Sequence, residues 1–538
     1  MQSAFGSLRH AAESGLVNGA ESLVNAALKG GVSLCFANAG TTELPLLLAL
    51  DAAPGIRPVL CLDEGVCTGA ADGYGRMLER PAMVLLHLGP GLANGISNLH
   101  NARRARSPVL NIIGQHATWH LEADPPLTMD IEALARTVSA WCRTSAPGES
   151  IASDVSEAIS ASLRGQIATL IVPSDCQTAQ VPPTETSILR SAPQSVDQQR
   201  VEQAARLLRR SGRAALLLGG QGLREKGLQA AARIQAATGC ALLAGTFPGY
   251  VERGLALPDA VRIPYFPEPA LDLLSRYDAF VLAGARAPVT FFGYEGIPGH
   301  LISPGQERLE MTEGDQDAAD ALEALADVLG APSWHDVARR VDAGRESLAV
   351  PEGDLTPESA CQTIAALQPE GAIILDEGLT AATTYYPLTA ASPPHTFLTV
   401  TGGSIGYGMP CAVGAALACP DRPVINVQAD GSAMYTVQAL WTQARESLNV
   451  TTLIASNRSY NILKLELDRA GITSPGPNTR SIIDLGRPDI EWPNLARGMG
   501  VPGVTVTTAE GLARELQRSL AEPGPHLIEM VLAARTRP

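Results

Sequence analysis

Oxygen-bearing side chains follow two apolar segments in the last third of the chain. Asp430 comes shortly after the apolar run at residues 423–427, and Asn457 follows the apolar run at residues 450–455. A carboxylate, a side-chain amide oxygen and a backbone carbonyl near Ser459 suit a hard cation such as Mg²⁺, which prefers oxygen donors and is commonly shared with phosphate oxygens. We therefore predict a magnesium site that also binds a phosphorylated ligand.

Two neighbouring strands must bring these ligands together. Both apolar runs are typical of buried parallel strands, and residues 435–447 between them are predicted to form a helix. Open α/β sheets bind ligands at the carboxyl ends of their strands, where Gly431 would let the backbone approach a diphosphate closely. Ser432 adds a hydroxyl and a backbone N–H near a helix start, where anions are favoured. Asp-Gly-Ser alone is a common turn, so the prediction depends on its ordered combination with Asn457.

A second group of candidate residues lies near the N-terminus. Glu64 follows an apolar strand and precedes a helix rich in small residues, which let a helix pack closely against a neighbour. On position alone, Glu64 is typical of an exposed carboxylate at a helix N-terminus. His87 directly follows a predicted strand, and the Gly-Pro-Gly turn at residues 89–91 has a backbone that can lie against a ligand. Residues 36–45 form a comparable exit from a strand into a loop.

Composition excludes several classes of function. The chain has 538 residues, 45% of them hydrophobic, and a net charge of −15, which argues against non-specific binding to nucleic acid. No run approaches the ~18 to 20 apolar residues that span a bilayer, and residues 1–5 show no signal-peptide pattern. The nine cysteines include no Cys-x-x-Cys pair and are typical of reduced thiols in a cytoplasmic protein.

Alternating strand and helix patterns recur in three blocks, which predicts an α/β protein with three doubly wound parallel-sheet domains. The predicted domains are residues 1–182, 195–348 and 355–538, separated by a polar, Pro-rich linker at 181–193 and a second linker at 350–354. The predicted strands of the first two blocks are 33–36, 59–62, 82–86, 109–113, 168–172, 214–220, 241–243 and 279–284.

The ordered Asp-Gly-Ser and Asn motifs resemble the signature of thiamine diphosphate enzymes. Residues 36–45 and 81–116 closely resemble benzoylformate decarboxylase and the acetolactate synthase-like branch, and the resemblance extends over nearly the whole chain. It is weakest in the middle block. Ala429 stands where that family usually has glycine before the aspartate, which leaves the ligands intact.

The resemblance implies a role for individual residues. Glu64 would bond the ring nitrogen of the cofactor's pyrimidine, the Gly403 carbonyl would accept from its amino group, and Ile405 would be the apolar wedge under the two rings. The cofactor is thiamine diphosphate with Mg²⁺, and the metal ligands would be Asp430, Asn457 and the Ser459 carbonyl. The other residues expected near the cofactor are Gly40, Asn94, Gly378, Thr380, Gly431, Ser432, Tyr460 and Ile462.

The resemblance also bears on the outcome of the reaction. His87 matches the active-site histidine of benzoylformate decarboxylase, and Thr41 matches its serine that contacts the substrate carboxylate. Gly293 stands where that enzyme has a second histidine, and Leu463 stands where pyruvate decarboxylases have an acid. General acid catalysis typically contributes ~100- to 10,000-fold, so loss of a protonating group favours attack on a second carbonyl.

We therefore expect decarboxylation of a 2-oxo acid with carboligation to an aldehyde or a second 2-oxo acid. A simple decarboxylase stays open, because His116 and His120 could compensate, although both are more typical of loop or surface residues. A 2-hydroxyacyl-CoA lyase would need a basic nucleotide pocket that the sequence does not show. A non-catalytic paralogue has no chemical reason to keep Glu64, Asp430 and Asn457.

The middle block and the assembly complete the expectations. Residues 200–330 lack the FAD-contacting pattern of acetolactate synthases proper, and the Gly-rich exit at residues 219–222 is a weak motif, so FAD is not expected. The resemblance implies a homodimer at minimum and a homotetramer by expectation, with Glu64 and Asp430 of one site on different chains. No nucleic-acid or membrane partner is expected.

Overall fold

The computed structural model describes residues 16–147, 150–183, 188, 194–342 and 344–533. Most of the linker predicted at 181–193, and the N-terminal residues inspected for a signal peptide, lie outside the described residues. Contacts divide the chain into two compact units. The first comprises residues 1–191, 400–505 and 518–531, and the second comprises residues 192–399, 506–517 and 532–538.

The first unit begins with a six-stranded sheet in the order β3-β2-β4-β5-β7-β6, whose pairs are all parallel. Its strands are β2 (Leu34–Asn38), β3 (Arg57–Leu60), β4 (Ala82–Leu86), β5 (Val109–Gln115), β6 (Trp141–Thr144) and β7 (Ile167–Pro173), and β1 (Val17–Asn18) pairs antiparallel with β8 (Gln180–Val181). The helices are α2 (Gly19–Lys29), η3 (Thr41–Glu43), α3 (Leu44–Asp51), α4 (Glu64–Leu78), α5 (Leu88–Ala105), η4 (Thr118–Ala123), α6 (Ile131–Arg136), α7 (Ile151–Ser162) and α8 (Ser174–Thr178). A buried apolar core joins α2, α3 and α7 to β2, β4, β5 and β7.

The first unit also contains the strands β17-β18-β20-β19, in that order. They are β17 (Val424–Ala429), β18 (Val450–Ser456), β19 (Gly503–Val506) and β20 (His526–Val531), with β17, β18 and β20 parallel. The helices of this part are α16 (Gly408–Ala418), α17 (Asp430–Ala433), α18 (Ala439–Arg445), α19 (Asn461–Arg469), α20 (Pro477–Ile483) and α21 (Trp492–Gly498). Helix α22 (Ala509–Ala521) is divided, with residues 509–517 in the second unit and 518–521 in the first.

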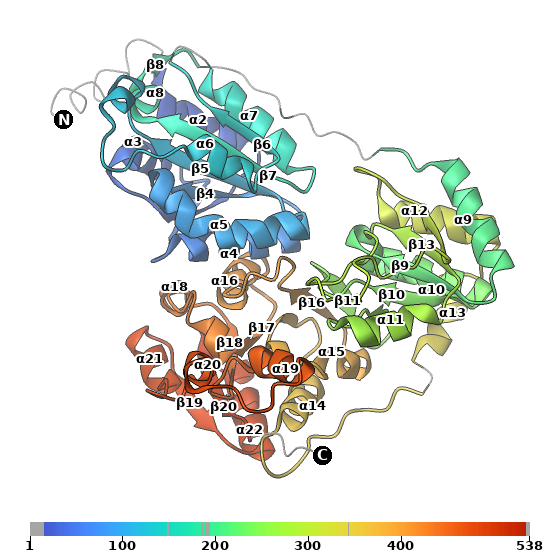
Figure 1. The fold of residues 1–538 in the computed structure, drawn as a ribbon. Coiled ribbons are helices and arrows are strands. Elements are labelled where there is room, and N and C mark those ends of the chain that lie inside the picture. The colour runs from blue at the N-terminus through green and yellow to red at the C-terminus, as the bar shows by residue number, and fades with distance from the viewer. Residues whose placement is uncertain (1–15, 148–149, 184–187, 189–193, 343, 534–538) are drawn as a thin grey trace. The chain divides into compact units, whose positions relative to one another are not determined.

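Small residues let α4 pack closely against α16, next to each other in Figure 1. A Cβ added to Gly73 would lie 2.2 Å from the Cys411 carbonyl oxygen, and one added to Gly414 would lie 1.8 Å from the Ala70 carbonyl oxygen. Real Cβ atoms do not approach so closely, so only glycine allows this packing. The close helix contact expected from the small residues after Glu64 is therefore present within one chain.

The helix predicted at residues 435–447 is shorter than expected. Residues before it form successive turns, in which Tyr435 N–H donates to the Ser432 carbonyl and Ala439 N–H donates to the Thr436 carbonyl. Helix α18 ends at Arg445, and Ser447 has a left-handed φ of 53°. This correction leaves the strand–loop–helix–strand order of the motif unchanged.

The second unit contains a five-stranded parallel sheet in the order β12-β10-β9-β13-β14. Its elements are α9 (Gln198–Arg210), β9 (Ala214–Leu218), η5 (Gly220–Leu223), α10 (Glu225–Thr238), β10 (Ala241–Ala244), β12 (Val261–Arg262), α11 (Pro267–Ser275), β13 (Ala279–Ala283), β14 (Glu307–Glu310), α12 (Ala318–Leu329) and α13 (Trp334–Val341). A Cβ on Gly219 would lie 2.5 Å from the Gly284 carbonyl oxygen. Close packing between two loops thus explains why glycine is needed at position 219, within the Gly-rich segment at residues 219–222.

A further group of strands in the second unit comprises β11 (Val251–Arg253), β15 (Ile373–Glu377) and β16 (His395–Thr399). β15 and β16 are parallel, whereas β11 from the middle block pairs antiparallel with β16. Helices α14 (Pro357–Leu367), η6 (Leu379–Ala381), α15 (Tyr385–Leu388) and η7 (Thr389–Ala391) accompany them. The sequence analysis did not predict β11, because three residues carry no detectable periodicity.

Candidate active site

The carboxyl ends of β2, β4 and β5 lie at one edge of the first sheet, because these strands are adjacent and parallel. Glu43 follows β2 and is fully buried. One of its oxygens lies 2.7 Å from His87 Nδ1 and also accepts from Gly40 N–H at 2.8 Å. The other oxygen accepts from Thr42 Oγ1 at 2.5 Å. A buried carboxylate therefore fixes the orientation of the His87 ring.

Glu43 is a site residue that sequence reasoning missed. A Cβ on Gly114, at the end of β5, would lie 1.6 Å from Glu43 Oε1, so glycine is required for the carboxylate to sit there. The available signal was an acidic residue in the loop after a predicted strand, at the same sheet edge as His87. The sequence comparison had instead drawn attention to Thr41, which is exposed, while its neighbour Thr42 contacts His87.

Gly40 and His87 lie against each other. A Cβ on Gly40 would lie 2.3 Å from His87 Nδ1, so any larger residue would displace the ring. His116 directly follows β5, which is next to β4 in the sheet, and its ring lies 6.0 Å from that of His120. Burial is the main cause that lowers the pKa of His116, with His120 and His87 acting in the same direction and Glu43 opposing them. The Nε2 of His116 is buried and has no hydrogen-bond partner among the described residues.

Glu64 begins α4, where Asp63 caps the helix by accepting from Gly65 and Val66 N–H groups at 2.8 and 3.3 Å. The Glu64 carboxylate is partly exposed and accepts from Asn94 Nδ2 at 3.1 Å. A Cβ on Gly91 would lie 3.5 Å from Glu64 Oε1 and 3.6 Å from His87 Cβ. Glu64 and His87 therefore flank the same turn of backbone.

Residues 401–407, here called the glycine loop, connect residue 400 to α16. Gly403 and Gly406 adopt left-handed φ values of 71° and 91°, and Gly403 and Ile405 are partly exposed. The loop has no regular secondary structure and is held from outside by side chains. Thr436 Oγ1, for example, donates to the Gly406 carbonyl at 2.8 Å.

Asp430 and Asn457 lie at the ends of the adjacent strands β17 and β18. Asp430 Oδ2 accepts from Arg458 N–H at 2.6 Å, and Asn457 Oδ1 accepts from Ser459 N–H at 2.9 Å, so the two strand ends meet as predicted. Asp430 is 3% exposed, and burial is the main cause that raises the pKa of its carboxyl group. None of the described lysine or arginine side chains forms an ion pair with it.

This donor set fits a hard cation. A buried carboxylate with no cationic partner among the described residues, next to a strand end that carries an amide oxygen, offers oxygen ligands of the kind that Mg²⁺ prefers. The Ser459 carbonyl, the third predicted ligand, accepts from Asn461 N–H at 2.8 Å. Within the described ranges, no three histidine, cysteine, aspartate or glutamate side chains form a cluster that could hold a metal ion. The predicted magnesium site would not form such a cluster, because Asp430 is its only acidic side chain and its other ligands are an amide oxygen and a backbone carbonyl.

The residues around Asp430 have defined roles in packing. A Cβ on Gly431 would lie 2.5 Å from Tyr460 Cε1, so Tyr460 covers this glycine. Ser432 Oγ donates to the Ala429 carbonyl at 3.1 Å and accepts from a glutamine side chain at 2.6 Å. Its hydroxyl proton is therefore used internally. Ile462, on α19, is partly exposed.

Comparison with known families decides the identity of this arrangement. Residues 17–134 match the family described as "Thiamine pyrophosphate enzyme, N-terminal TPP binding domain", and residues 378–530 match "Thiamine pyrophosphate enzyme, C-terminal TPP binding domain". The chain belongs to the thiamine pyrophosphate enzymes. The two matched regions carry Glu64 and Asp430, respectively.

Relatives within the thiamine pyrophosphate enzymes cover almost the whole chain. The chain is 49% identical over 519 residues to the Mycobacterium tuberculosis protein named "Putative acetolactate synthase large subunit IlvX", covering 96% of this chain and 99% of that protein. It is 30% identical to benzoylformate decarboxylase of Pseudomonas aeruginosa, covering 93% and 96%. The fold is similar to the thiamine diphosphate-dependent 4-hydroxybenzoylformate decarboxylase of Rhodococcus jostii RHA1, with a TM-score of 0.83, 23% identity and coverage of 97% and 100%.

Three of the eight described non-glycine residues with a positive φ lie in segments that carry predicted site residues. Leu88, Leu379 and Arg458 have left-handed φ values of 54°, 50° and 56°. Such values are unfavourable for side chains other than glycine, and they cluster at functional sites. Leu88 follows His87 and Arg458 lies between Asn457 and Ser459.

Gly378 and Thr380, which flank Leu379, belong to the second unit. Gly378 N–H donates to Asp376 Oδ1 at 3.3 Å, and its carbonyl accepts from Ala381 N–H at 3.0 Å. The loop is thus a tight turn after β15. Among the described helices, none is long and apolar enough to cross a bilayer.

Proposed function

We propose that this enzyme binds thiamine diphosphate and Mg²⁺ and decarboxylates a 2-oxo acid with carboligation to a second carbonyl compound, as an acetolactate synthase does. The main structural support for carboligation is that His87 is paired with the buried Glu43 and lies beside Glu64. The two positions expected to hold further protonating groups carry Gly293 and Leu463, neither of which can donate a side-chain proton. The 49% identical relative named as an acetolactate synthase supports the same reaction.

The cofactor supplies the carbon nucleophile and the electron sink needed to break a bond next to a carbonyl group. The chain's residues would hold and orient it. Glu64 would hydrogen-bond the pyrimidine ring nitrogen, the Gly403 carbonyl would accept from the pyrimidine amino group, and Ile405 would support the rings. Asp430, Asn457 and the Ser459 carbonyl would bind Mg²⁺ and through it the diphosphate.

His87 would orient the substrate. Its Nδ1 is occupied by Glu43 and Thr42, so Nε2 is the nitrogen left to contact a substrate carboxylate or carbonyl oxygen. With one positioned histidine, release of a free aldehyde lacks a second proton donor. Transfer to another carbonyl compound therefore competes better with protonation.

A simple 2-oxo acid decarboxylase of the benzoylformate decarboxylase type is the second candidate. It is favoured by His116, whose buried Nε2 has no hydrogen-bond partner among the described residues and whose pKa is lowered mainly by burial, with smaller contributions from His120 and His87. If His116 delivers the proton, aldehyde is released. The benzoylformate decarboxylase of Pseudomonas aeruginosa is 30% identical.

A product assay tests the two candidates. Purified protein with Mg²⁺ and thiamine diphosphate would be given pyruvate, benzoylformate and related 2-oxo acids together with an added aldehyde. Carbon dioxide with a hydroxyketone or an acetohydroxy acid supports carboligation, whereas carbon dioxide with free aldehyde supports the second candidate. No carbon dioxide from any acid, with cofactor bound, contradicts both.

Two variants test the binding roles by calorimetric titration of the cofactor with Mg²⁺. Glu64→Gln should leave thiamine diphosphate affinity largely intact while nearly abolishing turnover, because the diphosphate is bound elsewhere. Asp430→Ala should weaken cofactor binding, because it removes the one carboxylate of the predicted ligand set. Full turnover in the first variant, or unchanged affinity in the second, would contradict the corresponding assignment.

We propose a homodimer as the smallest active unit, with Glu64 and Asp430 of one site on different chains, and a homotetramer as the complete assembly. The resemblance to the acetolactate synthase-like branch supports this assembly. We also propose a cytoplasmic location, because all nine cysteines are free thiols and seven of them are buried, as suits a reducing compartment.

A further inference from the structure

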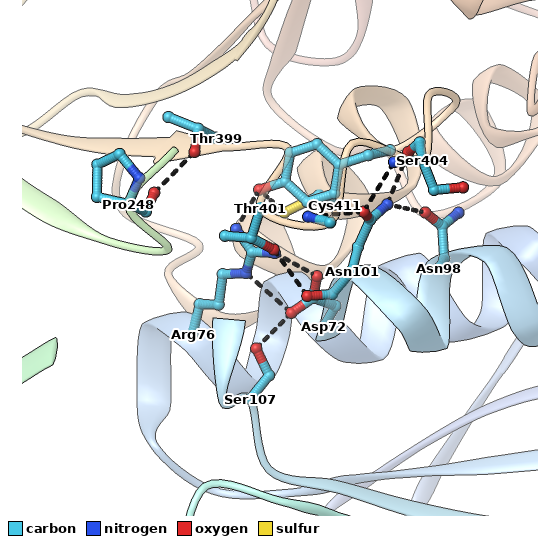
Figure 2. A network of polar contacts seen from close by, with 12 residues as sticks. Asp72, Arg76, Asn98, Asn101, Ser107, Pro248, Thr399, Thr401, Ser404 and Cys411 are labelled. Atoms are coloured by element: carbon cyan, nitrogen blue, oxygen red, sulfur yellow. Dashed lines mark hydrogen bonds and ion pairs between the residues drawn. The ribbon is translucent and has the colours of Figure 1, made fainter. Parts of the chain in front are cut away.

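Two buried asparagines on α5 hold the glycine loop, and no role has been assigned to either. Asn98 and Asn101 are 1% and 0% exposed and lie one helical turn apart on the same face. Figure 2 shows both amides directed toward the segment that contains Thr401 and Ser404. Buried amides are costly unless their hydrogen-bonding groups are satisfied, so their partners are informative.

Asn101 makes a full set of hydrogen bonds with the loop and with its neighbour. Its Oδ1 accepts from Gly402 N–H at 3.1 Å and from Ser404 N–H at 3.3 Å. Its Nδ2 donates to the Ser404 carbonyl at 2.8 Å and to Asn98 Oδ1 at 3.0 Å. Thr401 Oγ1 also donates to the Asn101 backbone carbonyl at 2.7 Å. One side chain thus replaces the backbone partners that the irregular loop lacks.

Asn98 connects the loop to the helix that begins at Glu64. Its Nδ2 donates to the Gly65 carbonyl at 3.0 Å and to the Gly406 carbonyl at 3.2 Å. Gly69 lies nearby, where a Cβ would lie 2.6 Å from Pro410 Cβ and 3.0 Å from Asn98 Nδ2. The first turn of α4, the middle of α5 and the glycine loop are therefore fixed by one pair of amides.

The pattern of bonds leaves several loop carbonyls without a donor among the described residues, and that of Gly403 is one of them. The amides hold residues 402, 404 and 406, whereas no group in the described part of the chain donates to the Gly403 carbonyl. Gly403 has a left-handed φ of 71°, which glycine adopts at little cost, so the direction of its carbonyl depends on the contacts that hold the residues on either side. Its carbonyl is the group expected to accept from the pyrimidine amino group.

We propose that Asn98 and Asn101 are positioning residues that present the Gly403 carbonyl to the amino group of the cofactor's pyrimidine. The amides act through the loop and do not touch the cofactor. This inference rests on the proposed binding of thiamine diphosphate. It adds a specific consequence, because weakening the amide pair should affect recognition of the amino group more than recognition of the diphosphate.

The test compares the affinity of thiamine diphosphate with that of an analogue lacking the pyrimidine amino group. Both would be titrated by calorimetry with Mg²⁺ into the full-length wild type and into Asn101→Asp. The variant has the same shape, but it loses the donors to the Ser404 carbonyl and to Asn98. Asn111→Asp is the matched control, because Asn111, on β5, is also fully buried and its Nδ2 donates to Thr169, not to the loop.

We expect the wild type and Asn111→Asp to prefer the cofactor over the analogue by about tenfold, the usual effect of one hydrogen bond. Asn101→Asp should lose most of this preference, with little change in affinity for the analogue. An unchanged preference in the variant, with a thermal midpoint close to that of Asn111→Asp, would overturn the inference. If Asn101→Asp does not fold, Asn98→Ser gives the same comparison.

Failure of this inference can be distinguished from failure of the proposed function. A wild type that binds neither compound contradicts the proposed cofactor and overturns both. A wild type that binds both compounds equally retains the cofactor but overturns the role of the Gly403 carbonyl, and with it the role of the amide pair.

Discussion

At the scale of single residues, the pairing of Glu43 with His87 is the feature with the most direct chemical consequence. Glu43 is fully buried and has three partners, Gly40, Thr42 and His87. A hydrogen bond to a charged group contributes about 1.5 to 3 kcal/mol. In the proposed reaction, Glu43 would therefore determine which nitrogen of His87 faces the substrate.

Glu43→Gln should lower kcat by about tenfold or more, because the amide cannot supply the same charge-assisted bond to His87. Steady-state kinetics would measure the fall in kcat. The affinity of the variant for the cofactor is expected to stay within about twofold of the wild-type value. Thr42→Val, which removes a neutral partner of the same ring, should have a smaller effect. An unchanged kcat in a folded Glu43→Gln variant would show that His87 needs no support from Glu43.

His116 predicts a dependence of stability on pH. Burial is the largest cause that lowers its pKa, with His120 and His87 acting in the same direction and Glu43 opposing them. When the pH falls below about 6.5, the unfolded chain binds a proton that the folded chain resists. The stability present above that pH is therefore lost as the pH falls toward the lowered pKa of the folded state.

Between about pH 7 and pH 5, the Tm of His116→Gln should therefore fall by less than the Tm of the wild type. Thermal unfolding followed by circular dichroism at several pH values would measure the difference. The control is His335→Gln, at an exposed position on α13, which should follow the wild type. Parallel curves for wild type and His116→Gln would contradict the expected burial of this ring.

At the scale of elements, the contact of α4 with α16 depends on backbone meeting backbone. Gly73 and Gly414 each leave space that a single methyl group would fill, and the clashing atoms are carbonyl oxygens that cannot rotate away. The same helix α4 begins with Glu64 and the same helix α16 follows the glycine loop. Helix separation and site geometry are therefore coupled.

Gly414→Ala should destabilise the protein by about 1 to 3 kcal/mol, as overpacking typically does. Gly498→Ala is the matched control, because a Cβ at this helical position meets open space, and a neutral or slightly stabilising effect is expected there. Thermal denaturation of both variants would measure the difference. Equal midpoints would show that the helices can move apart without cost.

At the scale of the whole molecule, the question is which chains contribute to one site. The described chain packs α4 against its own α16, whereas the proposed assembly places Glu64 and Asp430 of one site on different chains. Inactive variants at these two positions can distinguish the arrangements. A symmetric dimer that shares its sites gains one intact site whenever the two variants pair.

An equal mixture of Glu64→Gln and Asp430→Ala chains, unfolded and refolded together, should recover about a quarter of the wild-type turnover if sites are shared and pairing is random. Turnover and dimer composition would be measured on the same sample, and each variant refolded alone is the control. Mixed dimers without activity would place both residues of a site on one chain.

Much of the fold was predictable because parallel strands buried on both faces have continuous apolar sequences. The strand at residues 82–86 was predicted with the bounds observed, and β5, β7, β9, β13, β17 and β18 were found within a few residues of prediction. Short or half-exposed elements were missed, including β1, β6, β8 and β11, because two to four residues show no period. The predicted fold class and family were confirmed, while the domain boundaries and residue roles stay predictions.

The sequence by itself determined the family and the order of the motifs, because oxygen ligands after apolar runs and glycines at turns are local features. It also placed Glu64 and His87 after strands of one sheet, and Asp430 and Asn457 after strands of another. Only the tertiary structure showed that Glu43 lies against His87, and that two asparagines on α5 hold a loop some 300 residues later in the chain. Those contacts depend on which strands become neighbours and how closely two helices approach, and neither is encoded in a local pattern.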